Sequence, residues 1–283
     1  MAVARPVSRV EVSKLTADLC LKANYRARPD VLALLKEARN SGATPAGNQA
    51  LEQLVANADI AASQALPLCQ DCGYVTVFAE VGQDVAFDGS FETAVQVGVG
   101  QGYELGYLRT SVIQDALTER VRPEVERPAN IYTTLVPGDT IKLTVMPKGG
   151  GSDNASRMAM LRPTAGVDEI VRFIVEAVAA SGAAACPPLF VGVGIGGSFD
   201  SVGLLAKKAL LRDFREPAQA PAAFEVEVRL LSEINKLGIG PAGLGGAVTA
   251  LGVAVATDRT HIACLPVAVN ISCNQLRSAS GTL

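Results

Sequence analysis

The chain has 283 residues, of which 49% are hydrophobic, so it is long and apolar enough to bury a sizeable core. Its 25 basic against 28 acidic side chains give a formal net charge of −3, which leaves no basic surplus for phosphates and excludes nucleic acid as an expected partner. The first residues lack an apolar signal segment and the least polar stretch, 177–197, is interrupted by glycines and prolines, so we expect a cytoplasmic protein without a membrane helix.

The first part of the chain is predicted to be helical. Apolar residues recur at helical spacing over residues 10–66, which predicts two or three helices. Within them, Cys20 is predicted to be a buried small hydrophobe. The pattern changes at Gly73, because residues 74–78 are β-branched and aromatic and predict a strand. Residues 69–71 are therefore expected in the turn that enters this strand.

The middle of the chain mixes helical and strand patterns. Residues 91–112 predict a helix despite their glycines. Residues 130–136 and 140–146 predict two strands, and the Pro-Gly-Asp sequence at 137–139 indicates a hairpin turn between them. A glycine-rich turn, residues 148–152, follows the second strand.

The second half alternates between the two patterns. Helices are predicted over 167–180, 200–211 and 224–237, and strands over 189–195, 247–256 and 261–271. No internal repeat is found. We expect a single α/β (mixed α+β) domain over 1–283, with a helical N-terminal region and mixed sheets flanked by helices.

Three of the six cysteines stand at the ends of apolar runs: Cys69, Cys186 and Cys273. In a chain without an export signal, such thiols are expected to stay reduced and free to bind metal. A structural zinc ion requires a fourth ligand, whereas a [4Fe–4S] cluster held by three cysteines leaves one iron open for a substrate. The cysteines therefore point to Lewis-acid chemistry.

Polar groups with catalytic potential accompany two of these motifs. Gln70 and Asp71 place an amide and a carboxylate beside Cys69, although Asp71 could instead simply cap the end of a helix. Lys148 and the three glycines after it can bind an anion through backbone N–H groups and charge. Because residues 148–152 lack the Gly-Lys-Ser/Thr order of the Walker motif, we favour a substrate carboxylate over a nucleotide phosphate as the anion. A merely flexible loop is the alternative.

Two further features have competing interpretations. His261 is the only histidine and lies twelve residues before Cys273, so it could transfer protons at one mouth of the site or be an ordinary core or surface residue. The string Gly192-x-Gly194-x-x-Gly197 matches the dinucleotide fingerprint. No second strand ending in an acidic residue follows it, so an NAD-dependent dehydrogenase is only a distant alternative.

Taken together and in this order, the motifs resemble the alpha subunit, or N-terminal domain, of the class I iron–sulfur fumarase and L-tartrate dehydratase family. The resemblance covers most of the chain. It rests on Leu-Cys-Gln-Asp at 68–71, Leu-Arg-Thr-Ser at 108–111, Pro-Lys-Gly-Gly-Gly-Ser at 147–152, Cys-Pro-Pro at 186–188, Gly-Ile-Gly-Gly-Ser at 194–198, Leu-Gly-Ile-Gly-Pro-x-Gly-Leu-Gly-Gly at 237–246 and His-Ile-Ala-x-Leu-Pro-Val-Ala at 261–268.

This resemblance implies a hydro-lyase that adds water reversibly to the double bond of a dicarboxylate. Fumarate and (S)-malate are the expected substrate pair, with L-tartrate or mesaconate as alternatives. The resemblance implies that a [4Fe–4S] cluster is held by Cys69, Cys186 and Cys273. It implies catalytic roles for Asp71, His261 and Arg109, and we expect substrate binding by Gln70, Arg109, Lys148 and Gly151.

Such enzymes need a second domain that supplies further carboxylate-binding groups and the base for the C–H proton. Since this sequence stops at Leu283, we expect a separate beta subunit, in a symmetric α2β2 assembly. Cys72 stands where the family has threonine, and Ala247 stands where many relatives have lysine. Cys72 could cap the open iron or replace the threonine hydroxyl, and we favour replacement. A cluster-holding but non-catalytic paralogue is the alternative that these departures suggest.

Overall fold

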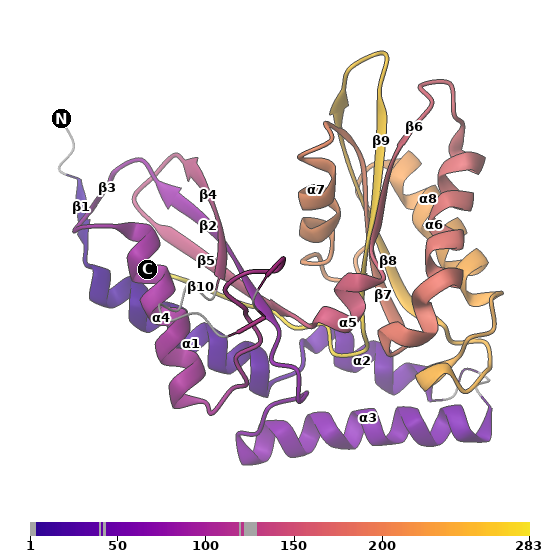
Figure 1. The fold of residues 1–283 in the computed structure, drawn as a ribbon, viewed down its shortest axis with the longest axis horizontal. Coiled ribbons are helices and arrows are strands. Elements are labelled where there is room, and N and C mark those ends of the chain that lie inside the picture. Colours follow the sequence, from indigo (N-terminus) through magenta and orange to yellow (C-terminus); the bar gives the residue numbers. More distant parts are fainter. Residues whose placement is uncertain (1–3, 40, 42–43, 119, 122–128) are drawn as a thin grey trace. The chain divides into compact units, whose positions relative to one another are not determined.

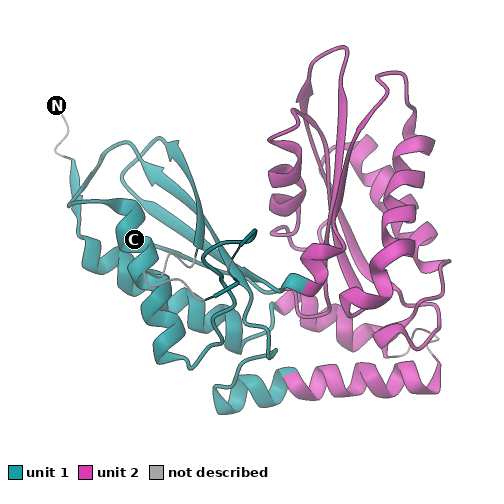
Figure 2. Cartoon of the chain, viewed as in Figure 1, with its two compact units in different colours: residues 1–28, 58–150, 277–283 teal, residues 29–57, 151–276 magenta. Residues whose placement is uncertain are grey.

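The computed structural model describes residues 4–39, 41, 44–118, 120–121 and 129–283. The chain forms two compact units (Figure 2): unit 1 comprises residues 1–28, 58–150 and 277–283, and unit 2 comprises residues 29–57 and 151–276. Each unit contains one four-stranded sheet with helices packed on it, which confirms the predicted mixed α/β class. The expectation that residues 1–283 act as one catalytic domain stays a prediction. Among the described helices, none combines the length and apolar character needed to cross a membrane.

Unit 1 is built on a sheet with the strand order β10-β5-β2-β4 (Figure 1). Helix α1 packs on β5 and β10, and begins at a capping box in which Ser8 and Glu11 bond each other's backbone N–H groups. The elements of unit 1 are β1 (Arg5–Val7), α1 (Arg9–Tyr25), β2 (Tyr74–Gly82), β3 (Val85–Phe87), α4 (Phe91–Leu105), β4 (Ala129–Val136), β5 (Ile141–Lys148) and β10 (Ala279–Thr282).

The predicted hairpin between the strands around residues 137–139 is wrong. Strand β4 pairs in parallel with one edge of β2, and β5 pairs antiparallel with the other edge. The connection crosses the end of β2 at Gly82, where a Cβ atom would come within 2.3 Å of the carbonyl oxygen of Gly138. Because β2 is buried over most of its length and β4 is mostly exposed, β2 takes the inner position of the sheet.

Helices α1 and α4 pack closely through glycines of α4. A Cβ at Gly98 would come within 2.4 Å of the carbonyl oxygen of Ser13, and one at Gly102 within 2.9 Å of that of Ala17. The glycines that weaken the helical pattern in the sequence therefore serve close helix packing. Cys20 lies at this contact with 0% of its surface exposed, which confirms the prediction that it is a core residue. Burial raises the pKa of its thiol to about 12.

Helix α4 ends earlier than predicted, at Leu105 instead of residue 112. Gly106 leaves the helical conformation, and Tyr107 has a φ of 49°, in the left-handed region. The residues after it, including Arg109, continue as irregular chain on unit 1.

Unit 2 has a sheet with the order β6-β9-β7-β8. Helix α7 covers one face, and α6 and α8 cover the other (Figure 1). Its elements are α2 (Pro29–Ala38), α3 (Pro45–Gln64, whose last part belongs to unit 1), α5 (Gly150–Asn154, whose first residue belongs to unit 1), β6 (Arg157–Leu161), α6 (Val167–Ser181), η1 (Gly182–Ala185), β7 (Leu189–Gly197), α7 (Val202–Ala209), α8 (Pro221–Asn235), η2 (Pro241–Gly243), β8 (Ala250–Thr260) and β9 (Leu265–Ser272).

The glycines of the dinucleotide-like string are explained by packing on β7. Val191 and Val193 belong to the apolar core shared with α6 and α8. Gly192 and Gly194 alternate with these valines and lie on the opposite face of the strand. A Cβ atom added at Gly192 or Gly194 would come within 2.3 or 2.6 Å, respectively, of a backbone oxygen of α7. These two glycines lie inside the strand and let α7 approach it, which removes the main support for a nucleotide site.

Candidate active site

The predicted turn before β2 is present in unit 1, between α3 and β2. Cys69 is half-buried and Gln70 is exposed. The Cys69 Sγ lies 3.3 Å from Oε1 of Gln70, to which the thiol can donate. A thiol and a side-chain amide therefore share the accessible rim of one short turn.

The carboxylate of Asp71 is held by two backbone N–H groups. Oδ1 accepts a hydrogen bond from Gly73 at 2.9 Å, and Oδ2 accepts one from Gly150 at 3.0 Å. A Cβ at Gly149 would come within 3.0 Å of Oδ2, so glycine there keeps room for the carboxylate. The glycine-rich string predicted to bind a substrate anion thus binds an anion of the chain itself. Asp71 is fixed in orientation while each oxygen keeps accepting capacity.

The backbone of this turn is anchored from the core by Arg277, whose role no sequence motif indicated. Its side chain is 2% exposed. Nη2 donates to the carbonyl oxygen of Asp71 at 2.8 Å, and Nη1 donates to Oδ1 of Asn24 at 3.0 Å. Arg277 therefore ties the turn to helix α1. The one indication of this role in the sequence was that Arg277 keeps the family's arginine in a segment after Cys273 that otherwise departs from the family pattern.

Cys72 differs from Cys69 in its surroundings. It is 2% exposed and belongs to the apolar core of unit 1. Burial raises the pKa of its thiol, and a hydrogen bond donated by the backbone N–H of Arg109 partly opposes that shift. This environment favours the interpretation that Cys72 replaces a threonine hydroxyl over the interpretation that it is a cluster ligand.

The two predicted cationic residues of unit 1 are placed differently. Arg109 is exposed, so its guanidinium is open to a ligand. Lys148 is the last residue of β5 and is 4% exposed, so its ammonium group is not on the open surface of unit 1. The role of Lys148 in substrate binding stays a prediction.

Cys186 and Cys273 lie on adjoining segments of unit 2. The backbone N–H of Asn274 donates to the carbonyl oxygen of Cys186 at 3.1 Å, and its side-chain Nδ2 donates to the same oxygen at 2.8 Å. Cys186 is exposed and has a φ of 56°, a left-handed conformation that costs a non-glycine residue about 1–2 kcal/mol. Such strain is concentrated at functional positions, and Asn274 stabilises it here.

His261 lies far from Cys273 within unit 2. It is exposed in the connection between β8 and β9, where its Nδ1 accepts a hydrogen bond from Ala263 at 3.1 Å. Cys273 follows the other end of β9, which has eight residues and therefore spans about 26 Å. The apolar run between them is an extended strand that separates its ends. The catalytic role of His261 stays a prediction, without support from closeness to Cys273 in the chain.

The cysteines fit an iron–sulfur cluster by their chemistry. Cys69, Cys186, Cys264 and Cys273 are half-buried or exposed, whereas Cys20 and Cys72 are buried in the core of unit 1. None of the six cysteines forms a disulfide, so none of the three proposed ligands is blocked by a disulfide from binding iron. Within the described part of the chain, no three His, Cys, Asp or Glu side chains gather as a metal site. Cys69 belongs to unit 1 and the other two to unit 2.

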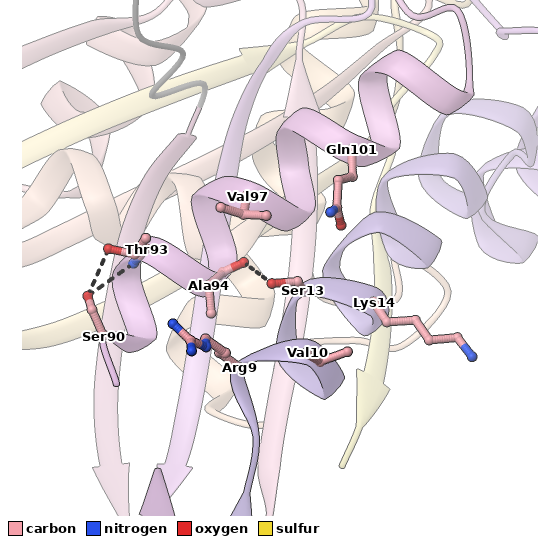
Figure 3. Close-up of a pocket in the computed structure, with 9 residues that line it drawn as sticks. All are labelled: Arg9, Val10, Ser13, Lys14, Ser90, Thr93, Ala94, Val97 and Gln101. Atoms are coloured by element: carbon pink, nitrogen blue, oxygen red, sulfur yellow. Dashed lines mark hydrogen bonds between the residues drawn. The ribbon is translucent and has the colours of Figure 1, made fainter. Parts of the chain in front are cut away.

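A separate pocket of about 410 Å³ lies on unit 1 where α1 and α4 begin (Figure 3). Arg9 and Lys14 contribute positive charge, and Val10 and Val97 contribute apolar surface. The hydroxyl of Ser13 is already used, since it donates to the carbonyl oxygen of Ala94 at 2.8 Å. None of the predicted site residues lines this pocket.

Comparison with known sequences identifies the family. Residues 13–282 match the profile of the family described as fumarate hydratase (fumerase). The chain belongs to the fumarate hydratase family. A Methanocaldococcus jannaschii protein provisionally named L(+)-tartrate dehydratase subunit alpha is 34% identical over 269 residues, which cover 93% of this chain and 94% of that protein. Proteins of Escherichia coli O157:H7 and strain K12, both named L(+)-tartrate dehydratase subunit alpha, are 28% and 27% identical over 265 residues, covering 93% of this chain and 88% of each.

The resemblance inferred from the motifs is therefore confirmed, and the chain is an alpha-subunit homologue among the hydro-lyases of the fumarate hydratase family. In this family context, the turn that carries Cys69, Gln70 and Asp71 is the best-defined part of the candidate site. It presents a thiol, an amide and an oriented carboxylate on one short segment.

Proposed function

We propose that this chain is the alpha subunit of a [4Fe–4S] hydro-lyase that adds water reversibly to fumarate and yields (S)-malate. The observation that carries the proposal is the turn at 69–71, where an accessible thiol is followed by a carboxylate fixed by two N–H donors, in a chain of the fumarate hydratase family. L-tartrate is the second candidate substrate, favoured by the names of the relatives. Mesaconate is a further alternative with the same reacting groups.

Cys69, Cys186 and Cys273 would hold the cluster. Their support is the match to the family motifs together with access to the molecular surface, which Cys264 shares and the enclosed thiols of Cys20 and Cys72 lack. When bound, a three-cysteine cluster supplies an open iron that acts as a Lewis acid on the hydroxyl oxygen of the substrate. The chain's own residues then have to orient the substrate and hold a proton.

Substrate orientation falls to the polar groups near the turn. The exposed guanidinium of Arg109 can pair with a carboxylate through two parallel N–H bonds, which fixes both position and direction. The exposed amide of Gln70 can donate to a second oxygen. Gly151 is exposed at the start of α5 and is proposed to contribute its backbone. Lys148 is proposed to contribute positive charge to substrate binding.

Asp71 is proposed to handle the proton at the hydroxyl end of the substrate. Dehydration removes a proton from one carbon and a hydroxyl group from the next, and the hydroxyl leaves as water once it is protonated. The carboxyl group of Asp71, held by Gly73 and Gly150, is pre-oriented to donate that proton in its protonated form, and its carboxylate form can accept one in the hydration direction. The base for the C–H proton is expected from the beta subunit. His261 is kept as a second candidate proton carrier.

The proposed partner is a beta subunit in an α2β2 assembly. The relatives are named as alpha subunits, which supports a heteromeric enzyme. The cytoplasm is the proposed compartment, because all six cysteines are outside disulfides and an iron–sulfur cluster requires reduced thiols.

The test is anaerobic co-expression with the homologue of the beta subunit, followed by iron and acid-labile sulfide analysis and kcat/KM values on (S)-malate, L-tartrate and methylated malate. We expect turnover of at least one, with Asp71→Asn lowering kcat about 100- to 10,000-fold at unchanged iron content. A complex with a full cluster that turns over none of these substrates would favour the non-catalytic paralogue. Nucleotide binding without iron would favour the dehydrogenase alternative.

A further inference from the structure

Two segments of the candidate site are joined in the core of unit 1. One is the turn 69–73, and the other is the segment 106–109 that follows α4. Tyr103 connects them, because its hydroxyl donates to the carbonyl oxygen of Cys72 at 2.6 Å and its own carbonyl accepts from the N–H of Leu108 at 2.9 Å. Tyr103 is 4% exposed, so these bonds are shielded from water.

Cys72 makes a second connection between the same segments. Its Sγ accepts a hydrogen bond from the backbone N–H of Arg109 at 3.2 Å, and lies 3.8 Å from the carbonyl oxygen of Cys69. A neutral thiol can accept at one side and donate at the other. A single buried side chain thus joins the backbone of the proposed cluster ligand to the backbone of the proposed carboxylate-binding arginine.

The position of Arg109 depends on this contact. Its side chain is exposed and is therefore placed by its backbone. The chain leaves α4 through a left-handed Tyr107, and the anchors before Arg109 are the hydrogen bonds of Gly106, Tyr107 and Leu108. Among the described residues, the bond to Cys72 is the one that Arg109 itself makes, and irregular chain follows it.

We propose that Cys72 is a positioning residue that fixes Arg109 relative to Cys69 and so sets the affinity for the substrate carboxylate. Its consequence for catalysis rests on the proposed function, whereas the backbone link does not. The proposal also implies that position 72 requires a side chain of this size that can both donate and accept a hydrogen bond. Threonine meets this requirement and valine does not.

The first test is amide hydrogen exchange at Arg109 in the assembled complex. Cys72→Val keeps the size of the side chain and removes the hydrogen bond, whose net value of about 1 kcal/mol corresponds to about fivefold faster exchange. Cys72→Thr should restore protection. Cys20→Val, which changes another buried thiol of the same core, is the matched control and should leave exchange at Arg109 unchanged. Equal protection of Arg109 in wild type and Cys72→Val would overturn the proposal.

The second test is kinetic. Cys72→Val should raise KM for the dicarboxylate about fivefold with kcat changed less than about twofold, and Cys72→Thr should restore KM. In an Arg109→Ala background, Cys72→Val should have no further effect, because the two residues act through one contact. An undiminished effect in that background would overturn the proposal, and so would loss of iron in both Cys72 variants, which would indicate a ligand.

Failure of this proposal can be told apart from failure of the proposed function. A wild-type complex that turns over no dicarboxylate, but shows faster exchange at Arg109 in Cys72→Val, would refute the function and retain the positioning link. An active complex with unchanged exchange and KM would retain the function and refute the link.

Discussion

The buried guanidinium of Arg277 offers a sharp test of how the catalytic turn is held. It donates to the carbonyl oxygen of Asp71 and to Oδ1 of Asn24 while only 2% of it is exposed. Arg277→Met keeps much of the volume of the side chain and removes both donors. The turn that carries Cys69 and Asp71 then loses its side-chain anchor to α1 and keeps the backbone hydrogen bond of Leu68 to Asn24.

The expected cost follows from the groups left behind. One acceptor is orphaned in the core, Oδ1 of Asn24, and one at a part-buried position, the carbonyl oxygen of Asp71. At about 1–3 kcal/mol for each fully buried acceptor, the loss is at most about 2–6 kcal/mol. The Nε of Arg277 is buried without a partner among the described residues, so removing a costly buried cation offsets part of this loss. We expect Arg277→Met to lower the free energy of unfolding by about 3 kcal/mol, a large share of the stability of an ordinary domain.

The assay is urea denaturation of the full chain followed by circular dichroism, with Arg26→Met as the control. Arg26 is exposed, belongs to the same unit and lies two residues after Asn24, so its replacement should change stability by less than about 0.5 kcal/mol. Arg277→Met should also make the Cys69 thiol react faster with iodoacetamide in the cluster-free chain. Equal unfolding midpoints for the two variants would refute the anchoring role of Arg277.

Three other predictions test the packing and the ligand assignment. Gly98→Ala should destabilise the chain by about 1–3 kcal/mol because its Cβ meets α1, whereas Gly203→Ala, in α7 with open space around it, should stabilise by up to about 1 kcal/mol; similar melting temperatures would refute the packing argument. Above pH 9 the thiol of Cys20 ionises in the unfolded chain, whereas in the folded chain, with a pKa of about 12, it stays protonated. The free energy of unfolding of the wild type should therefore fall with rising pH, relative to that of Cys20→Val, by up to about 1.4 kcal/mol per pH unit. Urea midpoints of the two proteins that run parallel from about pH 8 to 11 would contradict this. Cys186→Ser should lose the cluster and Cys20→Ser should keep it, and equal iron content would refute the ligand assignment.

Local patterns in the sequence predicted the helices well and the strand pairing poorly. The predicted helix at 167–180 is α6, Val167–Ser181, because its periodicity is local. The turn at 137–139 does occur, but the strands on either side pair with β2, which lies more than fifty residues earlier. Strand β10 forms only because β5 offers it an edge, and nothing in its four residues indicates a strand.

The candidate site shows the same division between local and distant information. The motifs identified Cys69, Asp71 and Arg109. Cys69 and Asp71 lie in the predicted turn, whereas Arg109 lies in irregular chain where the sequence predicted a helix. The partners of these residues come from distant segments: Gly150 for the carboxylate of Asp71 and Arg277 for its carbonyl oxygen. Single-sequence patterns contain no information on such contacts. A motif therefore indicates the reacting groups, and the fold has to show what orients them.

The most direct test of the proposed function is the elimination of water from (S)-malate and L-tartrate by the anaerobically assembled αβ complex, measured together with its iron content. We expect about four irons per alpha chain and steady formation of the dehydrated product from at least one substrate. A complex with that iron content, intact fold and no elimination from either substrate or from methylated malate would contradict it.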